Sequence, residues 1–135
     1  MGNDSWRVMC AIESDALNEH NDCGLRAVSI ATGLPYRMVR MAFAERGRRP
    51  RCGVRHYMVR GVLESFGYRM QEISAPGKTF RAAVRNLKEY PWSKPVLLSS
   101  SPHIACFRDG ELQDHASERL YRVTGAWIVT KRRTS

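Results

Sequence analysis

The sequence contains no apolar run that approaches the ~20 residues a helix needs to cross a bilayer. Its first residues show no basic stretch followed by an apolar one, and Trp6 stands where a myristoylation motif has Ser or Thr. Internal repeats and low-complexity linkers are also missing. With 43% hydrophobic and 26% charged residues, the composition is that of a globular protein rather than a disordered or fibrous one. We therefore expect a soluble cytoplasmic protein without membrane contact.

Cysteine is sparse, and the four cysteines lie at long, irregular spacings without a C-x-x-C motif. Where no secretion signal is seen, such spacing argues against a disulfide framework. Each thiol is therefore expected to be a buried apolar group, a ligand or a nucleophile. The four positions are Cys10, Cys23, Cys52 and Cys106.

Lysine is rare too. Only four of the 22 basic residues are lysines, against 13 acidic residues, so the net charge of +9 rests on arginine. Such a charge attracts nucleic acid weakly and non-specifically whatever the protein does. Aromatic residues do not interleave with the arginines, so a base-stacking platform for nucleic acid is not favoured. One cluster could contact an acidic partner, and it consists of Arg46, Arg48, Arg49 and Arg51.

The length of 135 residues allows one domain with a real core, covering residues 1–135 with a flexible basic tail from about 131. Apolar residues at helical spacing and at alternating spacing mark the expected elements. The expected helices are 23–32, 36–46, 54–66 (with Tyr57 inward) and 80–89. The expected strands are 68–73, 95–100, 103–108, 111–115 and 120–130, with 6–12 as a short strand or lead-in and 13–22 as a loop. Helices first and antiparallel strands later predict an α+β fold.

The first chemistry-bearing segment is Asn21-Asp22-Cys23-Gly24, where a polar loop turns into a helix. Asp22 is expected to cap that helix, which places Cys23 in its first turn. The partial positive charge at a helix N-terminus stabilises a thiolate and lowers its pKa. Gly24 has no side chain and would let a substrate backbone approach closely.

The second segment is a hairpin whose turn is expected at residues 109–110, Asp-Gly, a strong two-residue turn signal. With this turn, Phe107 lies opposite Leu112. Because side chains alternate between faces, His103 and Asp114 then share one face as diagonal neighbours, roughly 7–8 Å apart at the backbone. Asp114 is thus placed to orient the imidazole of His103, which a cysteine nucleophile needs as its base.

The segments NDCGLRAVSIATGLPYRMV and HIACFRDGELQD resemble the papain-like cysteine peptidases, above all the bacteriocin-processing peptidase domains of ABC exporters. They also resemble small phage-encoded proteins. The resemblance implies a minimal papain-like fold and a peptidase or isopeptidase that needs no cofactor or metal. It implies Cys23 as nucleophile, His103 as base and Asp114 as the orienting acid, acting on a peptide or protein substrate. It further implies a phage origin and action in the host cytoplasm.

A cysteine hydrolase also needs hydrogen-bond donors for the oxyanion. The backbone N–H of Cys23 is one candidate. The exporter peptidases use a Gln a few residues before the Cys, whereas this chain has Gln only at 71 and 113. The side-chain amide of Asn18 or Asn21 is the candidate that remains.

Three other hypotheses stay open. A catalytically inactive protein of the same fold would bind a host protein or nucleic acid through the arginine-rich face. A cell-wall peptide hydrolase also begins a helix with its Cys, but usually follows it with Ser-Gly, absent here, and would need export. A zinc site would use Cys52, His56, His103 and Cys106. Residues 103 and 106 fall on opposite faces of a strand, so no metal is expected.

Overall fold

The structure is a computed structural model, and it describes residues 5–89, 94–101, 103–114 and 119–132. Within these ranges the α+β fold is confirmed. The helices are α1 (Ser5–Ala16), α2 (Cys23–Thr32), α3 (Tyr36–Glu45), α4 (His56–Ser65) and α5 (Phe80–Lys88). The strands are β1 (Tyr68–Glu72), β2 (Val96–Ser100), β3 (His103–Arg108), β4 (Glu111–Leu112) and β5 (Gly125–Lys131).

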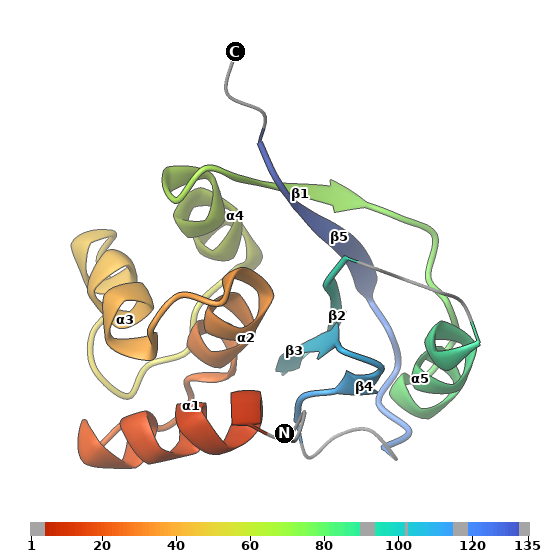
Figure 1. Cartoon of the computed structure of the whole chain (residues 1–135), viewed down its shortest axis with the longest axis horizontal. Helices are drawn as coiled ribbons and strands as arrows, with labels where there is room; N and C mark the ends of the chain where they lie inside the picture. Colours follow the sequence, from red (N-terminus) through yellow and green to blue (C-terminus); the bar gives the residue numbers. More distant parts are fainter. Residues whose placement is uncertain (1–4, 90–93, 102, 115–118, 133–135) are drawn as a thin grey trace.

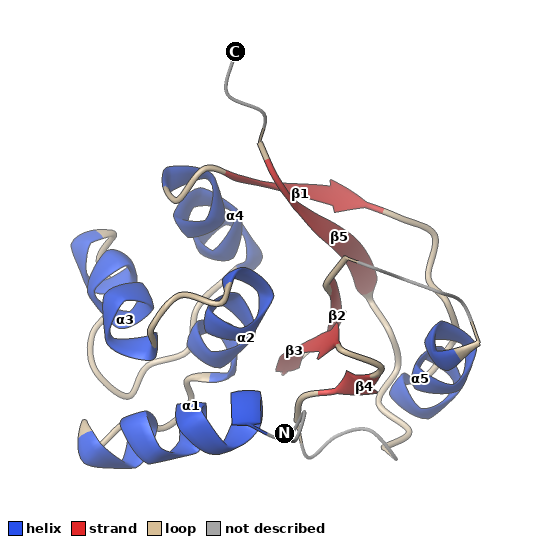
Figure 2. Ribbon diagram, viewed as in Figure 1, coloured by secondary structure: helices blue, strands red, loops and turns tan. Residues whose placement is uncertain are grey.

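The strands form one antiparallel sheet in the order β1-β5-β2-β3-β4. Helices α1 to α4 lie on one side of this sheet and α5 lies on the other (Figures 1 and 2). Each side has its own apolar cluster, which explains why the central strand β2 is buried along its whole length. On β2, Leu97 faces the α1–α4 side, whereas Val96 and Leu98 face α5.

Several predicted helix ends are confirmed by their local chemistry. The helix predicted over 23–32 is α2, and Gly33 ends it with a φ of 75°, a left-handed conformation that glycine adopts without strain. Its N–H donates to the carbonyl of Ser29 at 2.8 Å. At the start of α5 the Thr79 side chain accepts from the N–H of Ala82 at 3.2 Å, as a helix cap does.

The prediction for the N-terminal segment is wrong, because residues 5–16 form α1 rather than a strand and a loop. Trp6, Cys10 and Ser14 lie four residues apart and turn toward the rest of the protein, so the contacts follow helical spacing. The apolar residues that suggested a strand face solvent instead. These are Val8, Met9 and Ile12, exposed by 49%, 62% and 61%.

Three further differences concern single elements. Tyr57, predicted to point inward from α4, is 71% exposed. Strand β4 ends at Leu112, because the N–H of Asp114 donates to the carbonyl of Leu112 at 2.8 Å. Residue 115, the last of the predicted strand, lies outside the described residues. Strand β5 begins only at residue 125, because residues 121 and 123 instead exchange backbone hydrogen bonds with the segment that leads into α5.

The prediction that Arg48 belongs to an exposed cluster is also wrong. Its side chain is 2% exposed, and its guanidinium forms two hydrogen bonds, of 3.0 and 2.8 Å, with the carboxylate of Glu19. Arg40 and the backbone N–H of Arg51 bind the same carboxylate at 2.7 and 2.8 Å. Glu19 therefore fastens the loop before α2 to α3 and to the loop after it, and a buried arginine without this partner would be an uncompensated charge.

We predict that Glu19→Ala lowers the free energy of unfolding by about 3–5 kcal/mol, because it leaves Arg48 buried and unpaired. Urea unfolding measures this loss. The matched control is Glu13→Ala, whose ion pair with Arg37 is exposed and should contribute less than about 1 kcal/mol. Equal losses in the two variants would contradict the role given to Glu19.

The same interaction makes stability depend on pH. The hydrogen bonds from Arg48, helped by Arg40 and opposed by burial, lower the pKa of Glu19 from 4.5 to about 2. A carboxyl with a lowered pKa stabilises the fold above its unfolded-state pKa, and this stabilisation is lost as the pH falls toward 2. We expect the stability gap between the wild type and Glu19→Ala to be full at neutral pH and to shrink over that acidic range.

Candidate active site

The three predicted catalytic residues come from three elements that meet at one end of the sheet. Cys23 is the first residue of α2, His103 is the first residue of β3, and Asp114 follows β4 by two residues. Helix α2 packs along β3 (Figure 1). The hairpin register is as predicted, with Phe107 opposite Leu112, and both turn residues have positive φ, as a type I′ turn requires.

The imidazole of His103 is hydrogen-bonded to Asp114 through its Nε2 atom. The two side chains are 14% and 16% exposed, so little water competes for this contact. The bond to Asp114, followed by the contact with Cys23, raises the pKa of His103 to about 10 against the opposing effect of burial. Because Nε2 is taken by Asp114, Nδ1 is the ring nitrogen left for the thiol.

The thiol of Cys23 lies half-buried against this ring. Burial raises its pKa, but the hydrogen bonds from His103 and from the backbone N–H of Ile104, with the positive charge of the ring, outweigh burial and lower the pKa overall. The opposite shifts of Cys23 and His103 favour a thiolate beside an imidazolium. By contrast, burial raises the pKa of Cys10 and of Cys106, so these thiols stay protonated at neutral pH.

Two aromatic rings also contact the His103 imidazole. The centroid of Phe80 lies 6.3 Å from that of His103, and the Tyr121 ring packs edge-on at 6.1 Å. Phe80 and Tyr121 also contact each other at 5.7 Å. No local sequence pattern identifies this pair, because the contact depends on how α5 and residues 119–123 dock beside β3.

Asp22 occupies the N-cap position of α2, as predicted, but its side chain makes no capping hydrogen bond. Its carboxylate points into the protein, where one oxygen accepts from Ser14 and Tyr36, each at 2.7 Å, and from Arg26 at 3.2 Å. These bonds lower the pKa of Asp22 although burial raises it. Asp22 is thereby bound to both α1 and α3. These bonds fix the backbone immediately before Cys23.

The structure shows that Gly24 has a role in packing. A side-chain carbon built on Gly24 would lie 2.4 Å from the Cγ2 atom of Val54, closer than atoms can approach. Val54 thus packs directly over the first turn of α2. The glycine permits this close packing of a neighbouring loop, and it is not among the residues that line the cleft described below.

The predicted oxyanion residues both take part in local contacts. Asn21 borders the cleft described below, but its side-chain amide donates to the carbonyl of Arg51 at 3.2 Å. Asn18 is not among the residues that line this cleft, and its carbonyl accepts from the Arg51 guanidinium at 3.5 Å. Both asparagines have positive φ, a conformation that asparagine tolerates. The N–H of Cys23, at the first position of a helix, has no acceptor within that helix.

A cleft of about 890 Å³ contains the thiol, the imidazole and the carboxylate. It runs between α1 and the start of α2 on one side and β3 with residues 113–114 on the other. Apolar side chains, including Ala27 and Ile30, form part of its wall. Charged residues of both signs also line it, and they include Arg7, Asp15 and Arg26.

Within the described part of the chain, no group of three or more His, Cys, Asp or Glu residues is arranged to hold a metal ion. The four residues of the zinc hypothesis are therefore not brought together. Cys52 is exposed, and His56 packs edge-on against Trp127 at 5.2 Å. The same described residues include no helix that is long and apolar enough to span a membrane.

No protein-family model matches this chain, and no curated protein or solved structure matches it either. The likeness to papain-like peptidases thus remains a prediction from the two sequence segments.

We predict that iodoacetamide alkylates Cys23 rapidly at about pH 6, where an ordinary thiol of pKa about 8.5 is almost unreactive. Because the lowered pKa depends on the imidazole, His103→Ala should slow this reaction at least tenfold. Mass spectrometry of digested protein measures the rate at each cysteine, and exposed Cys52 serves as the internal control. Equal rates at Cys23 and Cys52 in the wild type would contradict the ion pair.

Proposed function

We propose that the protein is a cysteine-dependent amide hydrolase, a peptidase or isopeptidase, that cleaves a peptide or protein substrate. The observation that carries this proposal is the His103 ring, hydrogen-bonded to Asp114 at Nε2 while it contacts the Cys23 thiol. This is the arrangement in which an imidazole activates a nucleophile and a third group orients the imidazole. The cleft beside the thiol supports the proposal, because it offers room for an extended chain.

The proposed reaction is acyl transfer in two halves. The Cys23 thiolate attacks the carbonyl carbon of the scissile amide, and the negative charge moves to the carbonyl oxygen, where the Cys23 N–H donates to it. When the carbon–nitrogen bond breaks, the His103 imidazolium gives its proton to the leaving amine, and a thioester remains on Cys23. His103 then takes a proton from water, the hydroxide attacks the thioester, and the acid product leaves with the thiolate restored.

Each supporting residue has a defined part in this scheme. Asp114 accepts the Nε2–H of the neutral imidazole, so that the unprotonated Nδ1 is the atom that faces the sulfur. The negative charge of Asp114 also stabilises the imidazolium. Phe80 and Tyr121 pack against the ring and support its position. Helix α2 contributes the positive end of its dipole to the thiolate. A phage origin and action in the host cytoplasm belong to the proposal as well, and only the sequence resemblance supports them.

The test is cleavage of a proteome-derived peptide mixture in water enriched in oxygen-18. We expect the wild type to generate new C-termini that carry the heavy isotope, because water resolves the thioester. Cys23→Ala should abolish them, and Asp114→Asn should reduce their rate of formation about 10²-fold or more, as loss of an orienting acid does. His56→Ala is the matched control for loss of a histidine outside the site.

Heavy-isotope products that persist in Cys23→Ala would contradict the mechanism. Their absence from the wild type, with Cys23 also unreactive toward iodoacetamide, would contradict the hydrolase itself. The hypothesis of a catalytically inactive binding protein would then take its place.

A further inference from the structure

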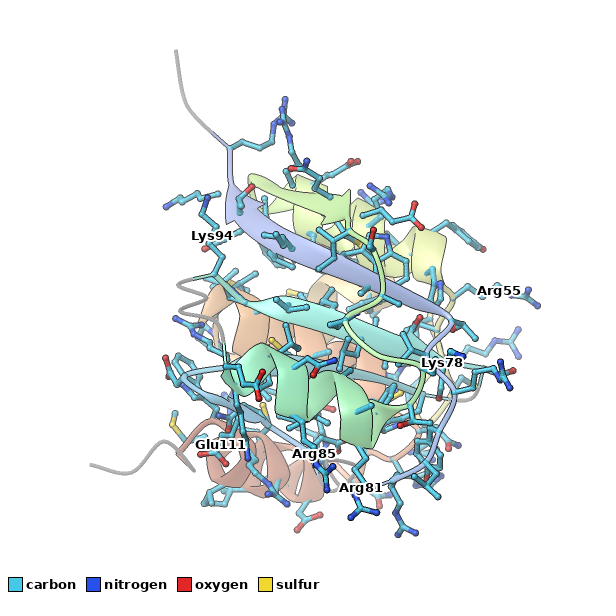
Figure 3. All side chains as sticks on the ribbon, turned by 90° about the vertical axis from the view of Figure 1, so that its right-hand side faces the viewer. Arg55, Lys78, Arg81, Arg85, Lys94 and Glu111 are labelled. Carbon is cyan, nitrogen blue, oxygen red and sulfur yellow. The ribbon has the colours of Figure 1, made fainter. Side chains whose placement is uncertain are left out.

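Basic side chains gather on the outer surface of α5 and on the segment that runs beside it. Figure 3, which looks onto α5, shows Arg81 and Arg85 projecting from one side of the helix and Lys78 near its N-terminal end. Between residues 78 and 88 every charged residue is basic. We call this surface the α5 rim. It consists of the exposed residues Lys78, Arg81, Arg85, Lys88, Arg119, Leu120 and Arg122.

The backbone joins the two halves of the α5 rim. The N–H of Phe80 donates to the carbonyl of Tyr121 at 2.9 Å, and the N–H of Arg81 donates to that of Arg119 at 3.0 Å. A further bond of 2.9 Å connects the N–H of Val123 with Lys78. Residues 119–123 are thus fixed alongside the N-terminal turn of α5, and the basic side chains of both segments belong to one continuous surface.

The α5 rim is connected to the His103 imidazole through two residues that contact this ring. Phe80 and Tyr121, whose backbones join its two halves, are the residues that pack on His103. Phe80 directly precedes Arg81, and Tyr121 lies between Leu120 and Arg122, all of which belong to the α5 rim. His103 therefore contacts both the Cys23 thiol and the two aromatic residues that join the halves of the α5 rim.

We propose that the α5 rim binds an acidic polypeptide segment of the substrate, next to the bond that is cleaved. The inference rests on the proposed function and adds the substrate class. Arginine guanidinium groups pair with carboxylates through two parallel hydrogen bonds, which suits aspartate and glutamate side chains. Leu120, which directly follows Arg119 in the sequence, is 70% exposed and offers an apolar contact.

These features favour a polypeptide over nucleic acid. Single-stranded nucleic acid is bound by aromatic faces that stack on bases. The aromatic residue of the segment, Tyr121, instead packs against Phe80 and His103. An exposed leucine gives a sugar-phosphate backbone no partner, whereas an acidic peptide with apolar residues matches both kinds of contact.

The test uses Cys23→Ala, which binds without turnover, and fluorescein-labelled peptides followed by fluorescence anisotropy. One probe alternates short Glu runs with Leu, and its neutral counterpart has Gln for Glu. We expect the acidic probe to bind at least about tenfold more tightly. Adding Arg85→Glu and Arg122→Glu should remove that preference, and Leu120→Ala should weaken binding about threefold.

The matched control adds Arg69→Glu and Lys131→Glu, two exposed positions on β1 and β5, at the opposite edge of the sheet. Both pairs change the net charge equally, so the control should alter the affinity less than about threefold. Thermal unfolding verifies that each variant is folded. Equal losses from the two pairs would overturn the proposal, since they would reflect net charge alone.

A single-stranded oligonucleotide serves as the competing probe. If it binds more tightly than the acidic peptide and loses affinity with Arg85→Glu and Arg122→Glu, the α5 rim is a nucleic-acid surface and the proposal fails. Because binding is measured without turnover, this outcome is independent of the hydrolase proposal, which the reactivity of Cys23 decides.

Discussion

The start of α2 is held against the start of β3, and the chemistry of the site depends on that contact. It places the Cys23 thiol beside the His103 imidazole, and the hairpin that follows β3 returns Asp114 to the far nitrogen of the ring. The pKa of Cys23 is lowered and the pKa of His103 is raised, which favours charge separation between the two groups, and burial of His103 and Asp114 limits the water that would weaken their contact. The thiol, the imidazole and the carboxylate thus form one coupled unit, on which the proposed hydrolase function rests.

Buried carboxylates hold the nucleophile's own segment in place. Asp22 is bound by side chains of α1, α2 and α3, and Glu19 by arginines from α3 and the loop after it. Both lie within four residues of Cys23. Such networks are costly to break because each partner would be left buried and unpaired. A pre-organised thiolate requires a rigid backbone at Cys23. If the thiol moved away from the imidazole, its pKa would return to an ordinary value.

Local patterns predicted the site more completely than they predicted the surface around it. The helix after Cys23 and the register of the Asp-Gly hairpin follow from spacing and turn chemistry, so the approach of Asp114 to His103 could be deduced. The inward turn of Asp22, the burial of Arg48 and the packing of Val54 on Gly24 join distant segments, and no local pattern encodes them. Helix α1 was missed because its exposed apolar residues mask the inward spacing of Trp6, Cys10 and Ser14.

The protonation state of His103 distinguishes a thiolate–imidazolium pair from an ordinary thiol beside a neutral imidazole. We would record imidazole nitrogen chemical shifts from pH 5 to about pH 11 and assign His103 by the signal lost in His103→Ala. The account predicts that both nitrogens stay protonated well above neutral pH, up to the raised pKa of about 10. Cys23→Ser and Asp114→Asn should each lower this pKa, because each removes a negative partner. A His103 ring that titrates near pH 6.5 in the wild type, unchanged in both variants, would contradict the coupled triad.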